Sequence, residues 1–175
     1  MNTKLNCIFK RRSIRSYIQD KPPIPEETIK DILESAMACP TACNMKAYDF
    51  IVLNDKTKLK QVSACLPFGK FLADAPLGIV ICGDINKVNA GELSYLLQDC
   101  SAAIENILIA ASELGLGACW LGVHPRKDRI KGIKNIFGLP DNIIPVSVVS
   151  IGCPDKALPK ARTQYDENKI HRNAW

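Results

Sequence analysis

The chain has 175 residues, of which 47% are hydrophobic and 23% are charged, and its formal net charge is +5 at pH 7. These values indicate one globular domain over residues 1–175, large enough to bury a sizeable core. The positive charge is concentrated in residues 1–21 and 153–175, and only 6% of all residues are aromatic. A nucleic-acid-binding protein needs a broader basic face with interleaved aromatic residues, so we expect no nucleic acid among the partners.

The first part of the chain alternates between helix and strand patterns. Apolar residues at helical spacing predict a short helix within residues 3–10, and Pro25 followed by two acidic residues predicts the start of a second helix. The apolar run at residues 48–53 predicts a strand that is buried on both faces. Asp55 is placed to cap a third helix over residues 56–64.

The middle of the chain contains its most apolar segments. A connection at residues 66–74 leads into a second buried strand over residues 75–82. A long helix, roughly residues 93–114, is apolar on almost every side, which is typical of a helix in the middle of a molecule or at a large subunit interface. Gly115 is expected to end this helix, and a third strand follows at residues 118–123.

Three segments complete the chain, namely a helix over residues 126–137, a strand over residues 145–152 and a tail over residues 153–175. The tail has too few apolar residues for a core of its own, and the terminal Trp175 favours a tail that docks on another surface over a disordered one. The alternation of strands and helices predicts an α/β protein, a three-layer sandwich of a sheet between helices. The order of the strands does not follow from the sequence.

Two features bear on where the protein works. Residues 95–114 contain charged and amide side chains, which excludes a membrane span, and residues 1–10 lack the pattern of a signal peptide. We therefore expect a cytoplasmic protein with no membrane partner. The eight cysteines include no Cys-x-x-Cys pair, and the chain has only two histidines, so we expect no metal site. We interpret the cysteines as small buried hydrophobic residues in a reducing compartment.

The clearest functional signal is the stretch from Lys10 to Tyr17, which contains four cations and two serines. Cations packed this closely repel one another unless an anion lies between them, and the planar fork of arginine matches phosphate or carboxylate. By itself, the stretch is equally compatible with an anion site and with a solvated basic face or a nucleic-acid-binding arm.

Several familiar motifs are missing from the sequence. It has no Gly-Lys-Ser/Thr phosphate loop, no Gly-x-Ser-x-Gly nucleophile elbow and no pair of histidines at metal-ligand spacing. Gly115 and Gly117 imitate a dinucleotide fingerprint, but they end a helix before a strand, whereas the fingerprint opens a helix after one.

Taken in order, the motifs form a distinctive series. Arg-Arg-Ser-Ile-Arg at residues 11–15 is followed by Pro-Thr-Ala-Cys-Asn-Met at 40–45, by Glu-Leu-Gly-Leu-Gly-Ala-Cys-Trp-Leu-Gly at 113–122 and by a basic tail. Over nearly the whole chain this series resembles the nitroreductase family in its short form. The resemblance implies a mixed central sheet flanked by helices (α/β or α+β) and an obligate homodimer with FMN at the subunit interface. It also implies that the tail docks on the partner subunit.

The resemblance also implies which residues contact FMN. The phosphate and ribityl chain would be held by Arg11, Arg12, Ser13 and Arg15, with a further basic contribution from Lys160 and Arg162. The loop residues Pro40, Thr41, Ala42 and Asn44 would approach the same flavin from the partner subunit. The strand residues Leu121, Gly122 and Val123 would present backbone amides to the flavin N5 and O4 edge, with the amide of Gly122 near N5.

The implied activity is that of an oxidoreductase in which NADH or NADPH supplies hydride and a small molecule, such as a nitro compound or quinone, accepts it by a ping-pong mechanism. No catalytic side chain is expected, because the flavin carries the chemistry and a backbone amide stabilises its reduced form. A flavin-binding regulatory module without turnover and a flavin-fragmenting relative remain alternatives.

Two departures from the family pattern bear on the site. Met45-Lys46-Ala47-Tyr48 stands where the family usually has Gln-Pro-Trp, so Lys46 is the candidate for the N1/O2 edge of the ring. The chain also lacks the long insertion that covers the flavin in longer members, which predicts a more open pocket.

Overall fold

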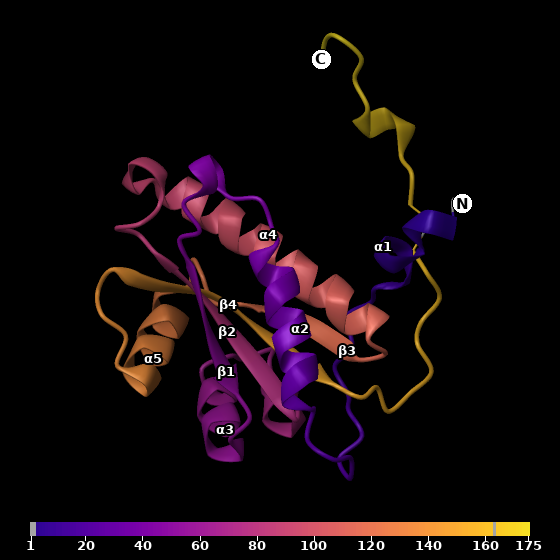
Figure 1. Cartoon of the computed structure of the whole chain (residues 1–175), viewed down its shortest axis with the longest axis vertical. Coiled ribbons are helices and arrows are strands. Elements are labelled where there is room, and N and C mark those ends of the chain that lie inside the picture. Colours follow the sequence, from indigo (N-terminus) through magenta and orange to yellow (C-terminus); the bar gives the residue numbers. More distant parts are fainter. Residues whose placement is uncertain (1–2, 163) are drawn as a thin grey trace.

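The computed structural model describes residues 3–162 and 164–175, and within them four strands form one sheet in the order β1-β2-β4-β3 (Figure 1). The neighbouring strands pair antiparallel. Their bounds are Tyr48–Leu53 for β1, Leu77–Asp84 for β2, Gly117–Gly122 for β3 and Ile143–Gly152 for β4. A parallel element is added by an isolated bridge between Ser13 and Ala118.

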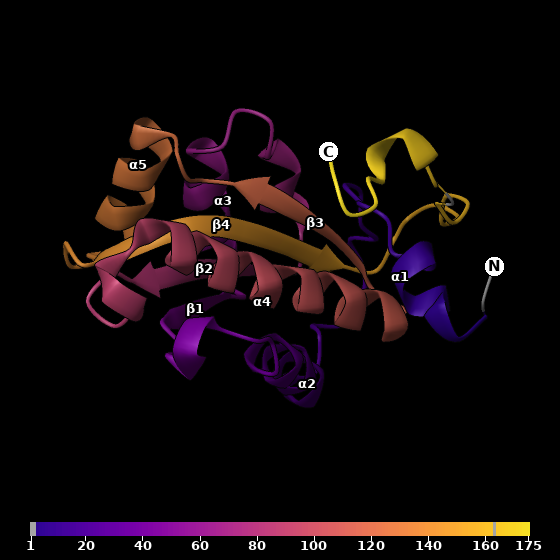
Figure 2. The same cartoon turned by 90° about the horizontal axis from the view of Figure 1, so that it is seen from above.

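The helices cover both faces of this sheet, which confirms the predicted three layers. Figure 2 shows α2 and α4 on one side of the sheet and α3 and α5 on the other. The α-helices are α1 (Asn6–Lys10), α2 (Glu26–Met37), α3 (Lys56–Ala64), α4 (Leu93–Glu113) and α5 (Lys127–Phe137). Short 3₁₀ turns lie at Thr3–Leu5, Ala42–Asn44, Lys70–Asp74, Asn89–Gly91 and Glu167–Lys169.

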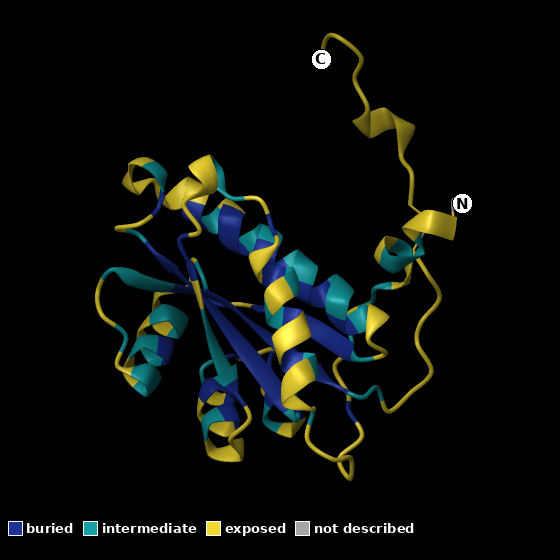
Figure 3. Ribbon diagram, viewed as in Figure 1, coloured by how far each residue is buried: buried dark blue, intermediate teal, exposed yellow. Residues whose placement is uncertain are grey.

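Two hydrophobic cores lie on the two faces of the sheet. In one core, Ile32 of α2 and Ile104 of α4 pack with Ile79 of β2. In the other, Leu59 of α3 and Ile133 of α5 pack with other residues of the same sheet. The central strand β2 is buried at every position, because both cores cover it (Figure 3).

The expectation that residues 48–53 are buried on both faces was wrong. These residues form β1, but Asp49 is exposed and the next three residues are only half-buried. The strand lies at the edge of the sheet, so only β2 pairs with it. An apolar run cannot by itself distinguish an edge strand from a central one.

The two ends of the chain lie side by side next to β3. The amide of Ile14 donates to the carbonyl of Ala118 at 2.9 Å, and the amide of Ile18 donates to the carbonyl of Cys153 at 3.0 Å. Further along the tail, the amide of Arg162 donates to the carbonyl of Phe9 at 3.0 Å. Residues 164–175 extend away from the sheet (Figure 1), and they are exposed and make no core.

The cysteines differ in burial. Cys39, Cys82, Cys100 and Cys119 are buried, as their interpretation as small hydrophobic residues requires, but Cys43 is exposed. Among residues 3–162 and 164–175, no helix has both the length and the hydrophobicity that a membrane span needs. In the same residues, no group of three or more His, Cys, Asp or Glu side chains could hold a metal ion.

Candidate active site

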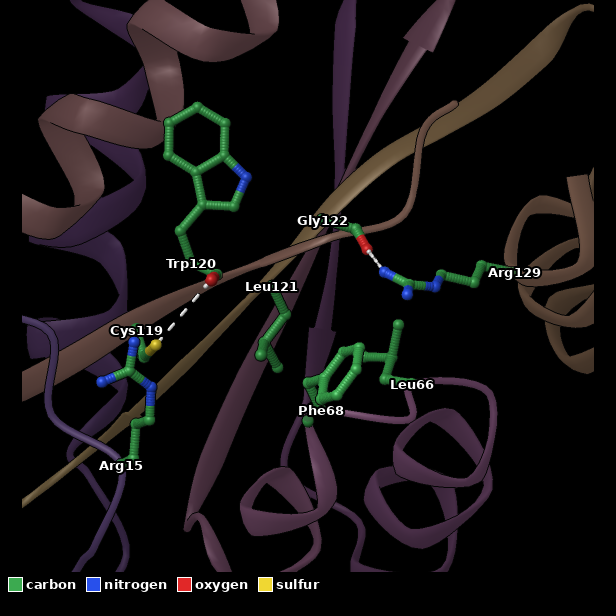
Figure 4. A pocket seen from close by; sticks show the side chains of 9 residues that line it. Arg15, Leu66, Phe68, Cys119, Trp120, Leu121, Gly122 and Arg129 are labelled. Carbon is green, nitrogen blue, oxygen red and sulfur yellow. Dashed lines mark hydrogen bonds between the residues drawn. The ribbon is translucent and has the colours of Figure 1, made fainter. Parts of the chain in front are cut away.

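A cavity of about 270 Å³ lies at the free edge of β3 (Figure 4). The N-terminal segment contributes Arg15, α5 contributes Arg129, and β3 contributes its last four residues. The connection between α3 and β2 provides part of the wall. The full lining consists of Arg15, Leu66, Phe68, Gly69, Cys119, Trp120, Leu121, Gly122 and Arg129. The cavity therefore joins the predicted arginine cluster to the predicted glycine strand.

Backbone groups of β3 point into this cavity. In an antiparallel pair, successive residues direct their N–H and C=O groups alternately toward and away from the partner strand. The carbonyl of Leu121 points toward β4, since it accepts from the Ser147 hydroxyl at 2.8 Å. The carbonyl of Ala118 points the other way, since it accepts from Ile14. By this alternation Trp120 and Gly122 direct their peptide groups away from β4, toward the free edge and its cavity.

Gly122 leaves open space beside the strand. A Cβ atom built on Gly122 would have no heavy atom within 4 Å, whereas one on Gly117 would lie 2.7 Å from the side chain of Ile14. The two glycines of β3 thus have different roles. Gly117 allows close packing of the N-terminal segment, while Gly122 leaves room for a ligand next to its backbone.

The structure separates the arginines of the cluster. Arg11 forms an ion pair with Glu105 of α4, with Nε and Oε1 3.0 Å apart. Arg12 donates through Nη1 to the carbonyl of Lys160 in the tail. Arg15 forms no ion pair within the described residues, and it reaches the cavity from the side of Cys119 (Figure 4). Burial raises the pKa of the Cys119 thiol, and the charge and hydrogen bond of Arg15 partly oppose this rise.

A second hollow of about 270 Å³ lies between the arginine cluster and the tail. It is lined by Ser13, Arg15 and their neighbours on one side and by tail residues 154–157 and 159 on the other. Arg15 is common to this hollow and to the β3 cavity. Lys160 and Arg162, which the resemblance assigns to the phosphate, contact the N-terminal part of the chain through backbone atoms, so their role at the phosphate stays a prediction.

The loop at residues 40–46 lies elsewhere. It leads into β1, which is the opposite edge of the sheet from β3, and none of its residues lines the cavity. The amide of Ala42 donates to Asp99 Oδ1 of α4 at 2.9 Å, and the amide of Lys46 donates to the Thr41 hydroxyl at 3.2 Å. Asn44 and Lys46 adopt positive φ angles of 56° and 51°. Pro40, at the start of the loop, is exposed.

Val123 is also placed away from the cavity. Its side chain is fully buried in the core beneath α3 and α5, and its amide donates to the carbonyl of Val146 at 3.2 Å. Leu121 and Gly122 do line the cavity. One chain therefore brings together Arg15, Leu121 and Gly122, with Ser13 beside them in the adjoining hollow.

Sequence reasoning missed most of the remaining wall. Phe68 is an exposed aromatic residue in a connection, and nothing in its local sequence indicated a site. Arg129 is one of several charged residues on an amphipathic helix. Trp120 was the exception, because it lies in the strand motif that the resemblance had already singled out.

Comparison with known proteins shows the family of this chain. The model of the nitroreductase family matches residues 8–68 and 61–153. A protein of Archaeoglobus fulgidus named "Putative NADH dehydrogenase/NAD(P)H nitroreductase" is 42% identical over 177 residues, which cover 100% of both chains. An FMN reductase (NADPH) of Bacillus subtilis is 26% identical over 191 residues, covering 100% of this chain and 75% of its own. The solved FMN-dependent nitroreductase of Clostridium difficile has a TM-score of 0.88 and 33% identity, covering 98% of this chain and 99% of its own. The chain belongs to the nitroreductase family.

Proposed function

We propose that this protein is an FMN-dependent oxidoreductase that takes hydride from NADH or NADPH and reduces nitro compounds, quinones or similar small acceptors. The observation that carries the proposal is that Arg15 and Gly122 line the same cavity, in which the backbone of Gly122 has open space beside it. The family and its FMN-dependent members support the same function.

The residues that are present fit FMN. The open space at Gly122 is one that any side chain would fill, and a flat ring can lie against the backbone there. Arg12, Ser13 and Arg15 surround the adjoining hollow or lie next to it, and they offer guanidinium and hydroxyl donors suited to a phosphate. These residues would hold the phosphate end, and the peptide groups of Trp120 and Gly122 would face the ring.

The chemistry divides between cofactor and protein. Bound FMN supplies a carrier that accepts and releases two electrons with a proton. The chain supplies a positive charge at Arg15 and backbone donors at the β3 edge, both of which favour negative charge in the cavity. A quinone acceptor leaves as hydroquinone after gaining two electrons and two protons, one carried with the hydride and one from solvent. Since donor and acceptor share one cavity, ping-pong kinetics follow.

We further infer that two copies of the chain form the working enzyme. The loop at residues 40–46 is separated from the β3 cavity of its own chain by the width of the sheet, so a second copy is needed to bring it to that cavity. Helix α4 also has Ile109, a half-buried apolar residue outside its core cluster, and the exposed Tyr95, both of which a second copy would cover. The tail beyond residue 162, which has exposed aromatic residues, is the segment proposed to dock on that copy.

The visible spectrum of the purified protein tests this function. We expect the absorption of oxidised flavin, its loss on anaerobic addition of NADH or NADPH, and its return when a quinone or nitroaromatic compound is added. A protein that neither carries nor binds FMN would overturn the proposal. A protein that holds FMN without being reduced by either nucleotide would show a binding module instead. Flavin lost irreversibly in the presence of oxygen would identify a flavin-fragmenting enzyme.

The cytoplasm stays the predicted location of the protein.

A further inference from the structure

The cavity at the β3 edge has a second cation, Arg129, for which the proposed function has no role. Figure 4 shows Arg15 and Arg129 on opposite sides of the cavity, with Leu121 and Phe68 between them. None of the described residues that line the cavity is acidic. The cavity is therefore electropositive at both ends, and only one of these cations lies next to the proposed phosphate-binding hollow.

Arg129 is held at the strand that the ring is proposed to face. Its Nη1 donates to the carbonyl of Gly122 at 2.7 Å, which fixes the guanidinium at the end of β3. Its Nε is shielded from solvent and has no hydrogen-bond partner within the described residues. No ion pair joins Arg129 to a carboxylate in this part of the chain either. The protein thus uses one donor of this guanidinium and leaves its charge unpaired.

The surroundings of Arg129 suit a flat aromatic molecule. Phe68, a large aromatic residue that lines the cavity, is 86% exposed. The ring of Trp120 points to the other side of β3, away from Phe68 and Arg129 (Figure 4). Aromatic side chains left open at a cavity offer stacking surface to a planar ligand. A ligand that stacks there next to Arg129 gains most if it also carries an anionic group, because arginine binds carboxylate through charge-assisted hydrogen bonds.

We propose that Arg129 makes this cavity selective for flat aromatic electron acceptors that carry a carboxylate or a similar anionic substituent. This inference rests on the proposed function, of which it names the substrate class. Arg129 acts in it as a specificity-determining residue that binds the acceptor's anionic group, while hydride transfer itself needs no side chain.

Ligand binding to the oxidised, FMN-loaded protein tests the inference without turnover. We would titrate benzoate and, as its neutral counterpart, benzyl alcohol, and follow the perturbation of the flavin spectrum. In Arg129→Gln, the dissociation constant for benzoate is expected to rise about tenfold, since a hydrogen bond to a charged group is lost, while that for benzyl alcohol stays unchanged. Arg129→Lys should recover part of the benzoate affinity, because it keeps the charge without the planar fork. Arg126→Gln, which removes an exposed cation next to the same helix, serves as the control and should bind both ligands like the wild type.

Turnover gives the second arm of the test. The KM for 4-nitrobenzoate should rise in Arg129→Gln while that for 4-nitrobenzyl alcohol stays constant. An equal rise of KM for both acceptors would mean a merely structural role and overturn the proposal.

The phosphates of the donor are another source of anionic groups, so NADH is compared with the neutral donor 1-benzyl-1,4-dihydronicotinamide. If the substitution weakens only NADH and leaves benzoate binding intact, the acceptor assignment is wrong. Failure of the proposed function would look different, since the protein would then bind no FMN, or would hold FMN that neither nucleotide reduces, whatever residue stands at position 129.

Discussion

Asp99 of α4 and Ala42 of the loop before β1 are joined by a hydrogen bond of 2.9 Å, from the backbone amide to Oδ1, across 57 positions of sequence. The carboxylate is buried at 5% exposure, and its second oxygen has no hydrogen-bond partner within the described residues. A buried carboxylate kept in this position holds the loop that is proposed to reach the flavin of the second copy.

Replacing Asp99 by Ala is expected to destabilise the protein by about 1–2 kcal/mol, because the half-buried amide of Ala42 loses its acceptor. The loop should also become more mobile, which trypsin cleavage after the exposed Lys46 would report. Asp99→Asn keeps an oxygen for the amide and should lose less in both measurements. If Asp99→Ala unfolds in urea like the wild type and resists cleavage equally, Asp99 does not hold the loop.

The two glycines of β3 should respond differently to the same substitution. Gly122→Ala is expected to leave the free energy of unfolding within about 0.5 kcal/mol of the wild type, because the new methyl group meets no atom of the protein. It should nevertheless weaken FMN binding about tenfold or more, because the methyl group takes up the space beside the ring. Gly117→Ala, with a Cβ 2.7 Å from Ile14, should cost about 1–3 kcal/mol of stability. Urea unfolding of the apoprotein and flavin fluorescence titration separate the two effects. Unchanged FMN affinity in Gly122→Ala would place the ring elsewhere.

Arg15 is the arginine expected to matter most for flavin binding, since it borders both hollows and no carboxylate among the described residues neutralises it. Arg15→Gln should raise the dissociation constant for FMN about ten- to a hundredfold, the value of a charge-assisted hydrogen bond. Lys10→Gln removes an exposed cation that lines neither hollow and is the matched control. The two variants should unfold alike in the absence of FMN. If Arg15→Gln and Lys10→Gln bound FMN with equal affinity, the arginine cluster would act only through its overall positive charge and Arg15 would have no specific role.

Arg11→Ala should also weaken FMN retention, with little change in stability. Its ion pair with Glu105 is partly exposed on both sides, and such surface pairs contribute about 0–1 kcal/mol. Glu105→Gln breaks the same ion pair but keeps the arginine, so it distinguishes loss of the pair from loss of the cation. FMN retention measured after gel filtration should fall in Arg11→Ala and not in Glu105→Gln. A fall of the same size in both variants would mean that Glu105 is needed to orient the arginine.

A buried carboxylate far from the cavity gives the protein a predictable response to acid. Asp84 accepts from the amide group of Asn142 at 2.8 Å, and this bond, together with the nearby Lys87 ammonium, lowers the pKa of the carboxyl group. A carboxyl with a lowered folded-state pKa adds stability above its unfolded value, about 3.9, and loses it as the pH falls through the folded-state value. Asn142→Ala should therefore cost about 1–2 kcal/mol at pH 7 and less at pH 3. Asn135→Ala, at an exposed position of α5, is the control. An equal cost at both pH values would mean that Asp84 is not the group involved.

Much of the fold follows from local sequence. The helix that begins after Pro25, the cap at Asp55 and the glycine that ends α4 lie where expected, because helix ends depend on nearby residues. Asp55 accepts from the amide of Lys58 at 2.8 Å, as a capping residue should. The strand over residues 75–82 was shifted, since β2 begins at Leu77 and continues through Asp84.

The site was only partly predictable, because its parts depend on strand order. The sequence indicated an arginine cluster and a glycine strand, and the bridge between Ser13 and Ala118 places them together. It did not indicate that β1 and β3 are opposite edges, which keeps the loop at residues 40–46 from the cavity of its own chain. Nor did it reveal Arg129, whose contact with Gly122 depends on how α5 packs after β3. Long-range pairing decides such contacts, and local patterns carry no information on it.

The free edge of β3 has a consequence for handling the protein. An edge strand with unpaired peptide groups is a template for intermolecular strand pairing and aggregation. The N-terminal segment shields this edge at Ala118 and Arg129 contacts the Gly122 carbonyl, but the amides of Trp120 and Gly122 face the cavity. A cofactor seated there would act as a cap on the sheet. Cofactor supply during expression should therefore determine how much protein is recovered without aggregation, independently of any effect on catalysis.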